Sequence, residues 1–188
     1  MLNQNFIQMC GQKSVIRELF SYGMERAKEI GYENVFDYSL GNPSVPTPES
    51  FTQEMIRLLS EEEPVKLHGY SPSLGIDSVR EAVAHSLNDR FDMNYQKEDI
   101  FMVSGAAGAI AHAVRAVTVP DDEILTFAPF FPEYTVFITQ AGMKCVEVKC
   151  SEEDFQIDFA ALEAAINEHT KAIIINSPNN PSGAVFSE

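Results

Sequence analysis

Residues 123–149, EILTFAPFFPEYTVFITQAGMKCVEVK, decide the fold of this chain. The apolar run Glu123–Phe127 predicts a strand, Phe131–Ala141 has the apolar spacing of a helix, and Lys144–Lys149 predicts a second strand. A strand, a helix and a strand in this order are typical of a parallel sheet with helical crossovers. The stretch therefore predicts an α/β fold.

The same alternation continues on both sides of this stretch. The further strands and helices are Ile100–Val103, Ala106–Val117, a helix from its cap Asp158 to about Asn167, and Ala172–Asn176. We therefore expect a sheet of about four strands, parallel or mixed, with helices on both faces. Residues 177–188 follow the last strand as a loop.

The first half of the chain predicts helices and no strand of note. These helices are Ser14–Ile30, Glu49–Ser60 and Ile76–Phe91. The loop Ser39–Pro48 separates the first two, because three prolines and a glycine exclude a regular element there. A second loop is predicted over Pro64–Gly75.

Composition and charge narrow the class of protein. The chain has 188 residues, 45% of them apolar and 22% charged, which is typical of a folded domain with its own core. Its net charge of −15 argues against binding to nucleic acid or to an acidic membrane, so the expected substrate is a small molecule. No apolar run approaches the ~20 residues of a membrane span, and the first residues do not resemble a secretory signal. We expect a cytoplasmic protein.

Cysteine and histidine spacing predicts no metal site and no disulfide framework. Cys10, Cys145 and Cys150 form no CxxC pair, and three thiols fit a reducing compartment. The four histidines, at positions 68, 85, 112 and 169, likewise show no ligand spacing.

Ser104–Ala109 follows a predicted strand and opens a predicted helix. Its small side chains allow an anion to approach the free N–H groups of the first helical turn, so a phosphate fits there. The segment matches neither of the glycine-rich nucleotide motifs, and close packing of a helix on a sheet also favours Gly and Ala. Both interpretations stay open on this segment alone.

Two further loops follow predicted strands, at the edge where parallel sheets bind ligands. Asn176–Gly183 carries prolines that fix tight turns and aim Asn side chains, so an amide there is able to donate to a ring oxygen or a carboxylate; a plain turn is equally consistent. Pro129–Pro132 carries aromatic rings that cover either a planar cofactor or the core, and the residues alone favour the core.

Five motifs in this order resemble the class I/II aminotransferases, pyridoxal-phosphate (PLP) enzymes of fold type I related to aspartate aminotransferase. The motifs are Leu40-Gly41-Asn42-Pro43, Gly69-Tyr70-Ser71-Pro72 with Gly75-Ile76 and Val79-Arg80-Glu81-Ala82, Ser104-Gly105-Ala106-Ala107, Pro129-Phe130-Phe131, and Asn179-Asn180-Pro181-Ser182-Gly183. The resemblance spans almost the whole chain. It implies that the chain corresponds to only the N-terminal part of such an enzyme. It implies that residues 1–48 form a helix and a substrate-facing loop, and that 49–188 begin the large, PLP-binding domain.

The resemblance also implies roles for individual residues. The backbone of Gly105, Ala106 and Ala107 would bind the PLP phosphate, and Phe131 would stack on the pyridine ring. Asn180 would donate to the phenolic oxygen of PLP and lie near the substrate carboxylate.

Two residues of the first half have implied roles as well. The backbone of Gly41 would face the substrate carboxylate, and Tyr70 would reach the cofactor phosphate of the partner subunit in a homodimer. The substrates would be an amino acid and a 2-oxo acid.

The chain departs from the family pattern in small ways at two places, and it lacks a match for three of the family's catalytic and binding residues. Ser182 replaces the commoner Thr, and Asp121-Asp122 stands where a Gly-Asp turn is usual. The family's Schiff-base lysine, its pyridine-pairing aspartate and its carboxylate-clamping arginine match no position here. The seven lysines, at positions 13, 28, 66, 97, 144, 149 and 171, are interpreted as solvated charges, so we expect this chain alone to be inactive.

Other functions share the same motifs. A PLP-dependent lyase of the same fold needs the same phosphate loop and Asn-Pro turn, and a non-catalytic module that binds PLP or phosphate would retain them. A nicotinamide-binding protein is disfavoured because GxGxxG is absent. The resemblance also implies that the strand after Asp99 pairs with later sequence, so we expect the isolated chain to associate through strand edges or to rearrange its sheet.

Overall fold

The computed structural model describes residues Gln4, Ile7, Gly11, 15–39, Gly41 and 43–187. Five residues named above lie outside the described ones, and they are Cys10, Lys13, Ser14, Leu40 and Asn42. The chain forms two compact units, residues 1–70 and 71–188. The predicted boundary between residues 1–48 and the large, PLP-binding domain refers to the domains of a whole enzyme, and it stays a prediction.

The first unit contains the helices α2 (Val15–Ile30), α3 (Glu49–Glu61) and α4 (Pro64–His68), with a 3₁₀ turn, η1, at Tyr32–Asn34. The first two confirm predicted helices to within one residue at either end. The prediction of a loop over residues 64–75 was wrong in its first part, where α4 lies.

The helix α4 forms because its first turn is capped and pre-shaped. The Glu63 carboxylate accepts hydrogen bonds from the backbone N–H groups of Val65, at 3.2 Å, and Lys66, at 2.9 Å. Pro64 occupies the first turn, where a missing N–H costs nothing. The Glu-Pro pair was the sequence signal for this short helix.

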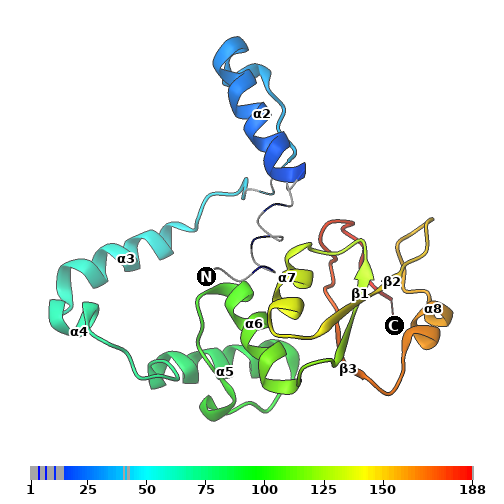
Figure 1. Ribbon diagram of the computed structural model, residues 1–188. Helices are drawn as coiled ribbons and strands as arrows, with labels where there is room; N and C mark the ends of the chain where they lie inside the picture. Colours follow the sequence, from blue (N-terminus) through cyan, green and yellow to red (C-terminus); the bar gives the residue numbers. More distant parts are fainter. Residues whose placement is uncertain are drawn as a thin grey trace. The chain divides into compact units, whose positions relative to one another are not determined.

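The second unit is the α/β part of the chain, as predicted (Figure 1). Its elements in chain order are α5 (Asp77–Phe91), a 3₁₀ turn η2 (Lys97–Asp99), α6 (Gly105–Val117), β1 (Glu123–Ala128), α7 (Glu133–Gln140), β2 (Lys144–Lys149), α8 (Phe159–Ala165) and β3 (Thr170–Ile174). Asp158 caps α8 by accepting from the Ala161 N–H at 3.0 Å, which confirms the predicted cap.

The three strands form a parallel sheet in the order β2-β1-β3. Leu125 on β1 lies opposite Val146 on one side and Ile173 on the other. The crossover from β1 to β2 uses α7, and the crossover from β2 back past β1 to β3 uses α8. These helices cover opposite faces of the sheet, as two right-handed crossovers in opposite directions require (Figure 1).

The expectation of about four strands was wrong. Residues 100–103 belong to no strand, because backbone becomes a strand only by pairing and no described segment pairs with them. Their N–H and C=O groups bond elsewhere: Met102 N donates to Leu74 O at 3.2 Å. The last strand also begins and ends two residues earlier than predicted, where its pairing with β1 sets its limits.

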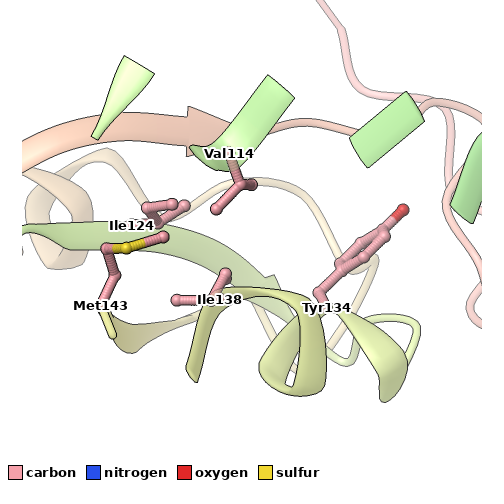
Figure 2. Close-up of a cluster of buried hydrophobic side chains, with 5 residues drawn as sticks. All are labelled: Val114, Ile124, Tyr134, Ile138 and Met143. Atoms are coloured by element: carbon pink, nitrogen blue, oxygen red, sulfur yellow. The ribbon is translucent and has the colours of Figure 1, made fainter. Parts of the chain in front are cut away.

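The core lies on both faces of β1. On one face Ile124 belongs to a buried cluster with Val114 of α6, Tyr134 and Ile138 of α7, and Met143 (Figure 2). On the other face a second cluster is built on Leu125, Phe127 and Val148, with residues of α8 packed against it. Each of the four residues 124–127 is at most 3% exposed, so β1 is the buried centre of this unit.

Arg80 joins α5 to the unpaired segment 100–103. Its side chain is 7% exposed, and Nε donates to Ile100 O at 2.9 Å while a terminal nitrogen contacts Asp77 at 3.1 Å. Gly75 lies against the same segment, with φ +103° and no room for a Cβ beside Met102. A buried guanidinium therefore satisfies a carbonyl that no strand partner reaches.

Replacing this guanidinium should destabilise the second unit. We expect Arg80→Met to lower the free energy of unfolding by about 1–3 kcal/mol, because the Ile100 carbonyl loses its donor. The measurement is urea unfolding followed by circular dichroism. The matched control is Arg90→Met on the same helix, whose exposed side chain bonds only within its own turn, and for which a change below about 0.5 kcal/mol is expected. Equal losses in the two variants would contradict this role.

Asp77 is held by two cations. Lys97 Nζ lies 2.9 Å from one carboxylate oxygen and Arg80 3.1 Å from the other. The hydrogen bond from Lys97, followed by its charge, lowers the pKa of Asp77 below the ordinary 3.8, and the same pair raises the pKa of Lys97. The interaction therefore stabilises the fold at pH above 3.8 and is lost as the pH falls below that value.

The lowered pKa of Asp77 can be measured directly. A titration of its carboxyl carbon by NMR should give a pKa below 3.8 in the parent chain and a higher one in Lys97→Met, since the largest cause of the shift is gone. Glu98→Gln, at the neighbouring position of η2, is the control and should leave the pKa of Asp77 nearly unchanged. A pKa that stays the same in Lys97→Met would refute this assignment.

Candidate functional site

The candidate site lies at the carboxyl ends of β1 and β3. These strands are parallel neighbours, so the loop after β1 (residues 129–132) and the loop after β3 (175–187) leave the sheet at the same edge. This is the edge of a parallel sheet at which ligands bind. The two predicted loops are therefore brought together by the sheet itself.

A buried amide fastens these loops to each other. Asn179 is 6% exposed, and its Nδ2 donates to Pro129 O at 2.8 Å and to Ser182 Oγ at 2.8 Å. Ser182 Oγ also accepts from Ala184 N at 3.3 Å. The turn is closed by two backbone bonds, Gly183 N to Asn179 O and Asn179 N to Ala184 O. Asn179 is thus the organising residue of the site.

Asn179 is part of the Asn-Asn-Pro-Ser-Gly motif, but no role was predicted for its side chain. In the doublet Asn179-Asn180, the first side chain is buried and the second is exposed. No described residue makes a hydrogen bond with the Asn180 amide, so this side chain is available to a ligand. An asparagine next to another in a proline turn was the available signal, but it does not tell which one points inward.

Phe131 follows β1 and packs at the rim of the core. Its ring meets the Tyr134 ring edge-to-face at 5.6 Å between centroids, and Phe130 lies parallel to the same Tyr134 at 6.2 Å. Phe131 remains half-buried, with the rest of its surface open. Burial also raises the pKa of Tyr134, whose hydroxyl points away from the core cluster (Figure 2). The core packing that the residues favoured is confirmed, and part of the ring is left for a ligand.

The first turn of α6 is open and rich in backbone donors. Gly105 has φ +80°, and a Cβ there would meet nothing within 4 Å. Ala106 and Ala107 are exposed, and no described residue accepts a hydrogen bond from their backbone N–H groups. The Ser104 side chain does not cap this helix. Free donors therefore face solvent, as an anion site requires.

The charge around this turn also favours an anion. Among the longer helices, α2, α3, α5 and α7 each carry an acidic residue in the first turn, at positions 18, 49, 77 and 133, whereas α6 carries none. The short helices α4 and α8 carry none either, but a carboxylate caps each of them, at positions 63 and 158. An acidic residue there would neutralise the positive end of the helix dipole. Because α6 packs Ile110 and Val114 over the start of β1, its first turn points toward the edge where β1 ends (Figure 1).

Gly41 and Tyr70 belong to the first unit. Both are exposed, and Tyr70 is fully so. Their predicted contacts with substrate and with a second subunit stay predictions.

The described lysines are surface ammonium groups. Lys28, Lys66 and Lys97 pair with carboxylates, and the pairing raises the pKa of Lys28 and Lys97. The other described lysines, at positions 144, 149 and 171, are exposed. None of these surroundings is the apolar, desolvated pocket that activates a lysine as a nucleophile.

Three further observations bear on other kinds of site. A hollow of about 190 Å³ lies between α5 and η2, lined by Glu81, His85 and Tyr95 among others, on elements other than those of the candidate site. Within the described ranges, no group of three or more His, Cys, Asp and Glu side chains is arranged to hold a metal ion. No described helix is both long and apolar enough to cross a membrane.

Comparison with known sequences gives one family. The family model for "Aminotransferase class I and II" matches residues 33–188. The chain is 34% identical over 156 residues to an aspartate aminotransferase of Thermotoga maritima, covering 82% of this chain and 40% of that protein. It is also 34% identical over 166 residues to a probable aspartate/prephenate aminotransferase of Aquifex aeolicus, covering 87% and 41%.

Solved structures agree. An aminotransferase from Eubacterium rectale superposes with a TM-score of 0.94 at 45% identity, covering all of this chain and 48% of that one. The aspartate aminotransferase of Thermus thermophilus with maleate gives a TM-score of 0.83 at 27% identity, covering 100% and 47%. The chain spans a little under half the length of these relatives. The family model over residues 33–188 and these relatives show that the chain belongs to the class I and II aminotransferase family.

Proposed function

We propose that this chain is the cofactor-anchoring part of a PLP-dependent aminotransferase, which transfers an amino group between an amino acid and a 2-oxo acid. The observation that carries the proposal is the meeting of the β1 and β3 loops at one sheet edge, fastened by Asn179, with the open first turn of α6 directed to the same edge. The family uses PLP, and the matched residues 33–188 include all three segments.

The residues present fit the phosphate of PLP. Gly105 holds a backbone conformation that favours glycine, and no side chain fills the space in front of it. The N–H groups of Ala106 and Ala107 are the donors for phosphate oxygens, and the absence of a carboxylate in this turn favours a dianion. These three residues would therefore anchor the cofactor.

The two loops would hold the aromatic ring of the cofactor. The open part of Phe131 is the stacking surface, and its contact with Tyr134 fixes the ring orientation. The exposed Asn180 amide would donate a hydrogen bond to the phenolic oxygen and would stabilise its ionised form. When bound, PLP supplies the electron sink that makes amino-group chemistry possible.

Two residues of the first unit have proposed contacts, one with the substrate and one with a second subunit. In this proposal the backbone of Gly41 would face the substrate carboxylate. The full exposure of Tyr70 leaves its hydroxyl free for the cofactor phosphate of a partner in a homodimer.

Two other functions use the same anchoring residues. A PLP-dependent lyase of this fold would bind the cofactor identically, and a non-catalytic module would bind PLP or phosphate without further chemistry. The relatives are named for amino transfer, which favours the aminotransferase.

A pair of matched glycine variants tests the phosphate site. Gly105→Ala should weaken PLP binding roughly tenfold or more, because a Cβ at φ +80° costs about 1–2 kcal/mol and turns the first N–H groups away. Gly108→Ala, on the same helix with room for a Cβ at 3.8 Å from Val103, should leave binding unchanged. The measurement is a titration of the cofactor absorption band, with competition by inorganic phosphate. Equal affinities in both variants would rule out this site.

The chain alone should show no amino transfer, because its described lysines are exposed or paired with carboxylates. Incubation with one equivalent of PLP, borohydride reduction and intact-mass measurement should show no covalently bound cofactor. A coupled assay with aspartate and 2-oxoglutarate should show no turnover above a heat-treated sample. One cofactor per chain on a single lysine, or turnover proportional to protein, would contradict the prediction.

A further inference from the structure

We infer that Asn179 is the positioning residue that sets the spacing between the ring-stacking loop and the phenol-binding loop, so that Phe131 and Asn180 act on the same cofactor ring. The inference rests on the proposed function. It assigns to Asn179 no contact with cofactor or substrate. Its role is exerted through the two loops that it joins.

The chemistry of the two acceptors fixes the orientation of the Asn179 amide. Pro129 O is a carbonyl and only accepts hydrogen bonds, so the atom 2.8 Å from it must be the NH₂ group. The second hydrogen of the same NH₂ group points to Ser182 Oγ, also at 2.8 Å. Both donors of one buried group are therefore used, one across to the β1 loop and one within the β3 loop.

The two hydrogen bonds from the Asn179 NH₂ group to Pro129 O and Ser182 Oγ are called the clamp here. The clamp lies close in sequence to both residues proposed to contact the cofactor ring. Pro129 lies two residues before Phe131, and Asn179 lies one residue before Asn180. The clamp thus joins the two loops within two residues of both proposed ring contacts. Since the loops come from parts of the sequence 50 residues apart, no local turn can set this spacing in its place.

Other bonds hold the β3 loop but do not reach the β1 loop. Ser177 Oγ accepts from Phe186 N at 3.0 Å, and Gln156 Nε2 donates to Val185 O at 3.0 Å. Breaking one of these loosens the β3 loop without cutting the bond to Pro129. Ser177→Ala is therefore a matched control for Asn179→Ala.

If the clamp has this role, its loss should lower the affinity for PLP but not the affinity for inorganic phosphate. Asn179→Ala should weaken PLP binding by roughly tenfold, the equivalent of about 1.4 kcal/mol, while inorganic phosphate at the first turn of α6 binds as in the parent chain. The pKa of the phenol of bound PLP, read from its absorption spectrum, should rise in this variant because Asn180 no longer reaches the oxygen. A merely structural role would weaken both ligands together and leave that pKa unchanged.

Variants of Ser182 test the clamp while Asn179 itself is unchanged. Ser182→Thr retains the hydroxyl acceptor and should bind PLP as the parent does, whereas Ser182→Ala should fall between the parent and Asn179→Ala. Ser177→Ala should match the parent for both ligands.

NMR of the parent chain tests the clamp without any cofactor. Both side-chain amide protons of Asn179 should exchange with solvent much more slowly than those of the exposed Asn180. Fast exchange at Asn179, or parent-like PLP affinity in Asn179→Ala, would overturn the inference and leave the proposed function standing. Failure of the parent chain to bind PLP while the Asn179 protons are protected would overturn the proposed function and, with it, the role of the clamp toward a cofactor.

Discussion

The burial of β1 on both faces and along both edges is the constraint on which the second unit depends. Its backbone pairs with β2 on one side and β3 on the other, and residues 124–127 are almost fully buried. A strand enclosed in this way needs parallel neighbours joined by crossovers on opposite faces, which α7 and α8 supply. Both loops of the candidate site then leave the sheet side by side, so the location of the site follows from the sheet.

Within that edge, two adjacent asparagines have different tasks. Asn179 is buried and uses both amide hydrogens within the protein, whereas Asn180 is exposed and its amide bonds to no described residue. A buried amide with unpaired donors would cost about 1–3 kcal/mol, so the partners of Asn179 are required for the turn to form at all. Fold stability and the proposed ligand geometry therefore rest on one group here, whereas the bond from Arg80 to the Ile100 carbonyl serves stability alone.

Sequence reasoning succeeded where local pattern and tertiary environment agree. The limits of β2 and the cap of α8 were predicted correctly because apolar runs and capping chemistry are local. Asp121, which stands where the family commonly has glycine, adopts φ +75°, a conformation that Asp tolerates better than most residues. Residues 100–103 have the composition of a strand, but pairing depends on a distant segment, so no local pattern tells whether it forms. The inward turn of Asn179 was unpredictable for the same reason, since its acceptor lies 50 residues away.

The net charge of −15 and the proposed affinity for a phosphate dianion are compatible because the effective charge is local. Surface charges are screened over about 8–10 Å at ordinary ionic strength, whereas backbone donors act at hydrogen-bond distance. What matters is therefore that the first turn of α6 carries no carboxylate, while four other helices of this acidic chain do. A phosphate at Gly105–Ala107 would meet free N–H groups before it meets any repelling side chain of its own helix turn. The overall charge then lowers the affinity for extended polyanions, which contact a wide surface, far more than for a small one held at a single helix end.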